Sequence, residues 1–265
     1  SGVITKLGPE VKGLEVGDHV VLSFIPACGP CPACSAGHQN LCDLGMGLRS
    51  GQAISDGTYR IQARGENVIP MCLLGTFSPY MVVNQSSVVK IDKDIPFEVA
   101  ALVGCGVPTG WGSATHIADV KPGEDVVIMG VGGVGISALQ GAVASGARYI
   151  FAIDPVPWKR EQALKFGATH AFESAAAAIQ PIIDATYGRM AQKTIITVGE
   201  MRGEYVEEAM ILTAKAGRCV VTAMGHLTDM DVKLNLFLMA MLQKDLQGNI
   251  FGGGNARQDV PNLLA

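Results

Sequence analysis

Four cysteines lie close together in the first part of the chain, and thiols are common metal ligands. Their pattern is Cys-x2-Cys-x2-Cys-x7-Cys, formed by Cys28, Cys31, Cys34 and Cys42. Two ordinary disulfides are hard to build at this spacing, whereas four thiolates can converge on one tetrahedral zinc ion. An iron–sulfur cluster is the main alternative. Because four protein ligands leave no open coordination position, we predict a structural zinc that takes no part in catalysis.

A further cysteine, Cys105, stands between two glycines, Gly104 and Gly106. Such a cysteine is either a small buried apolar residue or a metal ligand that its bare neighbours leave accessible. The residue types alone leave both interpretations open.

A glycine-rich segment, Gly130-Val-Gly-Gly-Val-Gly135, has the spacing of a phosphate-binding turn. It follows the continuous apolar run 126–129, which is typical of a buried parallel strand, and apolar residues at helical spacing come after it. A second apolar run, 149–153, ends on Asp154. An acid about 20 residues beyond the glycines completes the pattern of a dinucleotide site. A tight structural turn is the alternative interpretation.

Each residue of this pattern has a physical task in binding a dinucleotide. Gly130 permits a tight turn, Gly132 lets the backbone approach a pyrophosphate, and Gly135 lets the helix pack closely on its strand. The N–H groups at the start of the helix, beside Gly133, would face the phosphates. Asp154 would accept hydrogen bonds from the adenosine ribose and repel a 2′-phosphate, which favours NAD over NADP.

The elements that must position these residues alternate after residue 125. Alternating strands and helices predict an α/β fold with a doubly wound parallel sheet. We expect strands at 126–129, 149–153, 169–172, 194–198 and 219–223, and helices at 159–166, 175–186, 204–215 and 235–243. The earlier part reads as β-rich, with strands at 2–7, 19–24, 77–83 and 87–91, a long loop at 43–72, and a helix at 96–114 interrupted at 103–110.

Composition limits the classes of function. A chain of 265 residues that is 48% hydrophobic can bury a substantial core and form two domains, or one and a half. A net charge of −4 argues against a nucleic-acid or anionic-membrane partner, and so against a zinc-ribbon nucleic-acid module. No apolar run is long enough to cross a membrane and no signal peptide is present, so we expect a cytoplasmic protein.

The two ends suggest an internal fragment. The chain opens at Ser1, without Met, in a strand-like pattern, and 259–265 reads as the start of an amphipathic helix with no stop.

The order of these features resembles the zinc-dependent medium-chain alcohol dehydrogenases over essentially the whole chain. The phrases 17–21, 75–77 and 104–110 are also similar to that family. The last is most similar to the actinobacterial branch, some members of which use a nitroso acceptor or oxidise thiol adducts of formaldehyde. The resemblance implies a Rossmann sheet plus a β-rich, GroES-like catalytic domain, incomplete at both ends. The implied domains are 1–106 with a zinc lobe at 28–42, 107–250 for NAD, and 251–265 returning to the catalytic domain.

The resemblance also implies roles for single residues. Cys105 matches a ligand of a catalytic zinc, and Phe24 matches an aromatic residue of the substrate pocket. The implied cofactor-binding residues pack on the nicotinamide (Thr109 and Val134), hold the adenosine ribose (Asp154 and Lys159) or line the cofactor groove (Val198 and Phe251).

The activity implied is the reversible, zinc- and NAD-dependent oxidation of an alcohol to an aldehyde or ketone, by a homodimer or homotetramer. The other two ligands of the catalytic zinc, a Cys and a His, are expected upstream of Ser1, so the catalytic centre would be incomplete in this chain and the chain itself inactive. A thiol-adduct-dependent formaldehyde dehydrogenase and a non-catalytic NAD-binding oligomeric scaffold are the alternatives.

Overall fold

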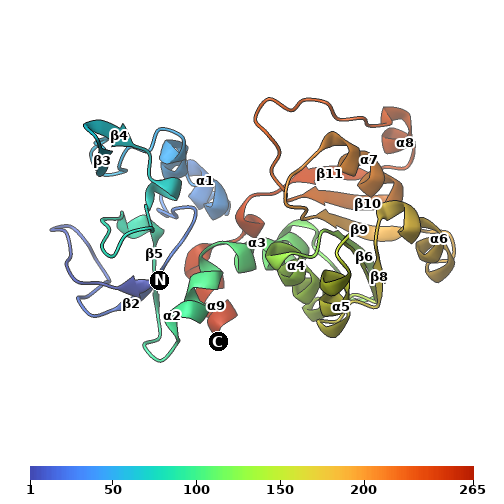
Figure 1. The fold of residues 1–265 in the computed structure, drawn as a ribbon, viewed down its shortest axis with the longest axis horizontal. Coiled ribbons are helices and arrows are strands. Elements are labelled where there is room, and N and C mark those ends of the chain that lie inside the picture. Colours follow the sequence, from blue (N-terminus) through green and yellow to red (C-terminus); the bar gives the residue numbers. More distant parts are fainter. The chain divides into compact units, whose positions relative to one another are not determined.

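The computed structural model describes residues 1–265, and the chain forms two compact units (Figure 1). The first unit comprises Ser1–Pro108 and Gly254–Ala265, and the second comprises Thr109–Gly253. The domain boundaries expected from the sequence stay a prediction.

The second unit contains a six-stranded sheet in the order β11-β10-β9-β6-β7-β8, and all its strand pairs are parallel. All five residues of β6, at the centre, are buried. This is the doubly wound parallel sheet that the apolar runs predicted. The strands are β6 (Asp125–Met129), β7 (Tyr149–Ile153), β8 (His170–Phe172), β9 (Ala191–Ile196), β10 (Thr213–Val221) and β11 (Asp245–Gly248).

Helices cover both faces of this sheet, and each face has its own hydrophobic core. On one face α4 (Gly133–Ala144), α5 (Pro157–Lys165) and the π-helix Ser113–Ile117 that follows α3 (Gly106–Gly112) pack against Ile128 and Ile150. On the other face α6 (Ala175–Ala185) and α7 (Gly203–Leu212) pack against Val127 and Phe151. A short helix, α8 (Leu236–Met241), precedes β11.

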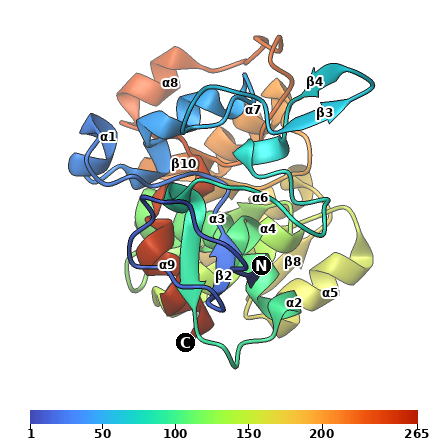
Figure 2. The same cartoon turned by 90° about the vertical axis from the view of Figure 1, so that its left-hand side faces the viewer.

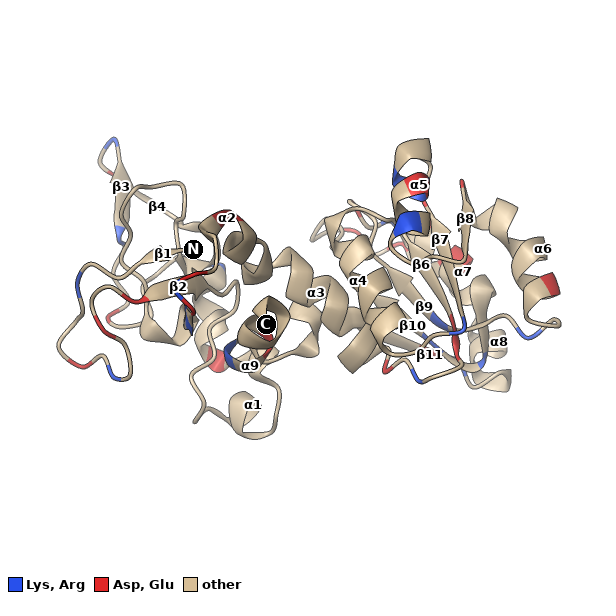
Figure 3. Ribbon diagram, turned by 90° about the horizontal axis from the view of Figure 1, so that it is seen from below, with Lys and Arg blue, Asp and Glu red and all other residues tan.

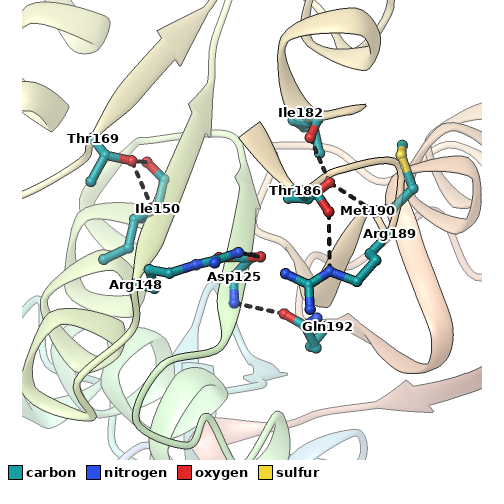
Figure 4. Close-up of polar contacts among 9 residues, drawn as sticks. All are labelled: Asp125, Arg148, Ile150, Thr169, Ile182, Thr186, Arg189, Met190 and Gln192. Carbon is teal, nitrogen blue, oxygen red and sulfur yellow. Dashed lines mark hydrogen bonds and ion pairs between the residues drawn. The ribbon is translucent and has the colours of Figure 1, made fainter. Parts of the chain in front are cut away.

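The amino ends of the central strands are held by an ion pair. Asp125, the first residue of β6, has a buried carboxylate that receives two bonds from the Arg148 guanidinium, at 2.9 Å from Nε and 2.6 Å from Nη2 (Figure 4). The Oε1 atom of Gln192 in β9 accepts a hydrogen bond from the Asp125 N–H at 2.8 Å. These contacts connect the chain entering β7 with β6 and β9.

The first unit has a small antiparallel sheet of β1 (Gly2–Val3), β2 (His19–Leu22) and β5 (Val88–Ile91), and a separate hairpin (Figure 2). The hairpin pairs β3 (Ile61–Ala63) with β4 (Glu66–Val68). Helices α1 (Pro32–Ser35), α2 (Phe97–Ala100) and α9 (Ala256–Leu264) complete this unit.

Several expected elements of the first unit differ in the structure. The strand expected at 77–83 is absent, because Pro79 lacks an N–H and restricts Ser78, and Phe77 is fully exposed. The strand expected at 2–7 shortens to Gly2–Val3. The expected loop 43–72 contains the β3–β4 hairpin, whose two turn residues both have positive φ: 54° at Arg64 and 80° at Gly65.

Two differences concern helix ends. The helix expected at 204–215 ends at Leu212, because the β-branched Thr213 is extended and begins β10. The Thr213 hydroxyl donates to the Ala209 carbonyl at 2.7 Å, which secures the turn. The break expected at 103–110 is narrower, since only Cys105, with φ −152° and ψ −74°, leaves the helical region between the helical segments.

Charged residues of both signs are interspersed along the chain (Figure 3). None of the helices combines the length and the apolar character that crossing a bilayer requires.

Candidate functional site

The four clustered cysteines converge in the first unit. Their Sγ atoms all lie within 4.8 Å of one another, and those of Cys31 and Cys42 are 4.0 Å apart. A tetrahedral zinc with Zn–S bonds of about 2.3 Å places its sulfurs roughly 3.8 Å apart. The thiol arrangement therefore fits a single tetrahedral metal ion.

The local backbone favours the anionic form of one of these sulfurs, that of Cys31. Cys31 is the N-cap residue of α1, and its sulfur accepts hydrogen bonds from the N–H groups of Asp43 and Cys34. These bonds, that of Asp43 first, lower the pKa of Cys31 to about 7. Burial raises the pKa values of Cys34 and Cys42. A divalent cation would supply the positive charge that deprotonates the buried thiols.

Cys105 lies between the 3-10 helix Ala101–Gly104 and α3, and its side chain is exposed in the first unit. A Cβ atom on Gly104 would lie 2.8 Å from the Leu22 carbonyl oxygen, so only glycine fits against β2 at this point. The Phe24 N–H donates to the Gly104 carbonyl at 3.1 Å. The structure thus brings Phe24 and the Cys105 segment together, while their catalytic roles stay predictions.

Cys72 is a neighbour of this region. Its thiol is half-buried, and its backbone has φ 59°. Burial, and next the charge of Cys105, raise the pKa of Cys72 to about 11. Nothing in the sequence indicates this proximity, because the two cysteines are 33 positions apart.

The glycines of the turn after β6 fall into two groups with different surroundings. Gly130 has φ 89°, and a Cβ there would lie 2.8 Å from the Val198 backbone. A Cβ on Gly135 would lie 1.9 Å from the Gly130 carbonyl oxygen. At Gly132 and Gly133, by contrast, no heavy atom lies within 4 Å of the position of a Cβ. The outer glycines permit close packing, and the inner two leave open backbone at the start of α4.

Asp154, directly after β7, is buried against this turn. Its carboxylate accepts hydrogen bonds from the Val131 N–H at 3.0 Å and from the Val156 N–H at 2.9 Å. The Lys159 Nζ atom, on α5, lies 3.6 Å from Asp154 Oδ2. The sequence did not reveal that this carboxylate also fixes the glycine turn. Each carboxylate oxygen retains a second lone pair for a ligand.

Thr197 is a further residue that the sequence did not indicate. It follows β9, and its hydroxyl lies 2.6 Å from the Gly130 carbonyl and 3.2 Å from the Met129 carbonyl. These contacts hold the glycine turn against the end of β9. The next residue, Val198, is half-buried. The carboxyl ends of β6, β7 and β9 therefore meet at one edge, where open parallel sheets bind ligands.

Gly110, the residue after Thr109, packs against the backbone of Val134. A Cβ on Gly110 would lie 2.0 Å from the Val134 carbonyl oxygen, so α3 and the first turn of α4 touch directly. Phe251, the remaining predicted residue, follows β11 and is buried, with φ 53°. All the predicted dinucleotide-binding residues lie in the second unit, but their contacts with a cofactor stay predictions.

Comparisons with known proteins agree with this arrangement. Residues 133–265 match the family model described as zinc-binding dehydrogenase, and residues 1–93 match the alcohol dehydrogenase GroES-like domain. Alcohol dehydrogenase B of Mycobacterium tuberculosis is 61% identical over 265 residues, which are 100% of this chain and 71% of that protein. The NDMA-dependent alcohol dehydrogenase of Amycolatopsis methanolica is 44% identical over 264 residues, covering 100% of this chain and 71% of that protein.

A solved structure shows the same architecture. The crystal structure of an alcohol dehydrogenase zinc-binding domain protein from Burkholderia ambifaria superposes with a TM-score of 0.88 at 29% identity, over 99% of this chain and 70% of that one. The parallel sheet with helices on both faces and the GroES-like match agree with these relatives. On this evidence the chain belongs to the zinc-dependent medium-chain alcohol dehydrogenase family.

Proposed function

We propose that this chain supplies the structural zinc lobe and the NAD-binding unit of an enzyme that oxidises an alcohol to an aldehyde or ketone. The observation that carries the proposal is the open backbone of Gly132 and Gly133 at the start of α4, beside the buried carboxylate of Asp154. A helix start with free N–H groups suits a pyrophosphate, and a buried acid suits a ribose.

The chain's own residues would divide the work of binding and orientation. The backbone of the glycine turn would hold the pyrophosphate, and Asp154 would accept from a ribose hydroxyl and exclude a 2′-phosphate. Thr109 and Val134 would form the wall for the nicotinamide, and Val198 and Phe251 would line the groove. When bound, NAD accepts the hydride and a catalytic zinc polarises the alcohol oxygen. Cys105 would contribute one thiolate ligand to that zinc, and Phe24 would contact the substrate.

Changing Gly132 to Ala tests the binding proposal without disturbing the fold. The new Cβ would meet no atom of the chain, but it would stand where the pyrophosphate approaches. Calorimetric titration with NAD should show at least roughly tenfold weaker binding, about 1.4 kcal/mol. The matched control is Gly2→Ala, whose Cβ also meets nothing within 4 Å. Equal affinities for the two variants would overturn the assignment of this turn to the cofactor.

Activity is tested on the native enzyme with a panel of alcohols, by following the absorbance of NADH. NDMA belongs in the same assay, because a relative 44% identical is NDMA-dependent. Thiol adducts of formaldehyde form a separate arm of the panel. Binding of NAD without any turnover would favour the non-catalytic scaffold.

We also propose that the protein assembles as a homodimer or homotetramer. Monomeric proteins rarely expose large contiguous apolar patches, and β11 is an edge strand whose outer side has no partner strand. The apolar side chains exposed between β10 and β11 include Met224, Leu227, Met230, Leu236, Phe237 and Met241. Light scattering on Phe237→Lys should give a smaller mass than on the unaltered protein, and an unchanged mass would exclude this surface.

A further inference from the structure

A cluster of three polar side chains joins α3 to the carboxyl ends of two strands in the second unit. Ser113 begins the π-helix that continues α3, Thr222 follows β10, and Asn249 follows β11. Single π-turns are rare and often mark functional sites. The three residues are far apart in the sequence, so only the fold brings them together.

The donors and acceptors of this cluster can be assigned. The Ser113 hydroxyl has one proton, and it donates to the Thr109 carbonyl at 2.6 Å. In the 2.9 Å contact with Ser113, Thr222 must therefore be the donor. The Asn249 amino group donates to the Ser113 hydroxyl at 2.8 Å and lies 3.2 Å from that of Thr222. The chain of bonds thus runs from the ends of β10 and β11, through Ser113, to the backbone of Thr109.

Close backbone contacts also restrain the position of α3. Gly110 touches the Val134 backbone, and a Cβ on Gly112 would overlap the Gly252 carbonyl oxygen. These contacts fix the distance of α3 from its neighbours, and Ser113 fixes the turn that presents Thr109.

One atom of the cluster indicates that Asn249 serves geometry more than stability. Its Oδ1 atom is buried and has no hydrogen-bond partner. A buried acceptor without a hydrogen bond lowers stability, so the unsatisfied Oδ1 atom offsets part of the stability that the two amino-group contacts provide. Removing the side chain would remove both the contacts and the orphaned acceptor.

We propose that Asn249 is a positioning residue that, through Ser113, holds Thr109 in place for the nicotinamide half of the cofactor. The inference rests on the proposed NAD site. Asn249 does not itself contact the reacting atoms. It affects the affinity of the surface formed by Thr109 and Val134 for the nicotinamide. The glycine turn and Asp154 bind the adenosine half independently of it.

The test compares two ligands that differ only in the nicotinamide. For Asn249→Ala, calorimetry should give roughly tenfold weaker binding of NAD and unchanged binding of ADP-ribose. Ser113→Ala should have the same effect, and the double variant should be no worse than either single one, because both changes break the same connection. The matched control is Asn235→Ala, which removes an exposed N-cap bond of α8 in the same unit and should leave both affinities unchanged.

Each other outcome counts against the inference. Equal losses for NAD and ADP-ribose would show a general structural role, and unchanged NAD binding would show that Thr109 needs no support. This inference alone is overturned if the wild-type chain binds both ligands and neither variant loses affinity for NAD relative to ADP-ribose. A wild-type chain that binds neither ligand overturns the proposed function as well.

Discussion

Replacing Arg148 by Met should destabilise the second unit more than replacing its partner Asp125 by Asn. The two side chains form a fork at 2.9 and 2.6 Å, and the Asp125 side chain is 1% exposed whereas that of Arg148 is 36% exposed. Arg148→Met leaves a buried carboxylate without its cation. Asp125→Asn leaves a guanidinium that water can reach, and it keeps one oxygen acceptor.

The expected magnitudes follow from this asymmetry. Breaking a buried ion pair by removing one partner costs about 3–5 kcal/mol. Because Arg148 is partly exposed, solvent screens the pair, and we expect about 2–3 kcal/mol for Arg148→Met. For Asp125→Asn we expect about 1 kcal/mol, the net value of one hydrogen bond. The same interaction raises the pKa of Arg148, and its largest cause is the hydrogen bond that Arg148 donates to the Asp125 carboxylate.

Urea unfolding followed by tryptophan fluorescence measures these changes. Both tryptophans, Trp111 and Trp158, belong to the second unit, so the signal reports on the unit that holds the ion pair. The double variant should show a coupling of about 1–2 kcal/mol between the two sites. The matched control is Lys121→Met, whose partner Asp119 is 51% exposed, and it should cost less than about 0.5 kcal/mol. The reasoning is refuted if Arg148→Met costs no more than Asp125→Asn or the control.

Three further outcomes are expected. Cys34→Ser should lose one zinc per chain by elemental analysis and expose 28–42 to proteolysis, since structural zinc contributes about 10 kcal/mol, whereas Cys105→Ser should retain that zinc. Gly135→Ala should cost about 3 kcal/mol or more in urea unfolding, because its Cβ would overlap a backbone oxygen, while Gly133→Ala should not destabilise the chain. The hydrogen bond from Arg60 lowers the pKa of Asp56 to about 2, so this carboxylate stabilises the hairpin region above its unfolded pKa of about 3.9 and loses that effect as the pH falls towards 2. An NMR titration of Arg60→Gln should show the pKa of Asp56 moving back up, and an unchanged pKa would contradict the assignment.

The parallel sheet and the zinc lobe could be predicted because their signals are local. The strands β6 and β7 are short, continuous apolar runs. Such runs are typical of parallel strands buried on both faces. The four cysteines lie within fifteen residues, so their convergence needs no long-range information. The helix expected at 159–166 is α5, which begins two residues earlier, at Pro157.

Features that depend on tertiary context could not be predicted. The strand β11 is the polar sequence Asp-Leu-Gln-Gly, and it becomes a strand because β10 offers an edge to pair with. The hairpin β3–β4 turns at Arg64-Gly65, where Arg adopts an unusual left-handed conformation. At the candidate site, the sequence led to the prediction that Asp154 binds a ribose. It did not indicate that the Val131 N–H donates to Asp154, nor that Asn249 reaches Ser113.

The position of Asp154 has a consequence for redesign. A protein engineer who wanted the chain to accept a phosphorylated ribose would first replace this acid with a small neutral residue. That change would also remove the two acceptors that satisfy the amides of Val131 and Val156, because the carboxylate proposed to bind the ribose also holds the loop. Successful designs should therefore carry a compensating oxygen acceptor near these amides. A single replacement of Asp154 should lower the affinity for both NAD and NADP.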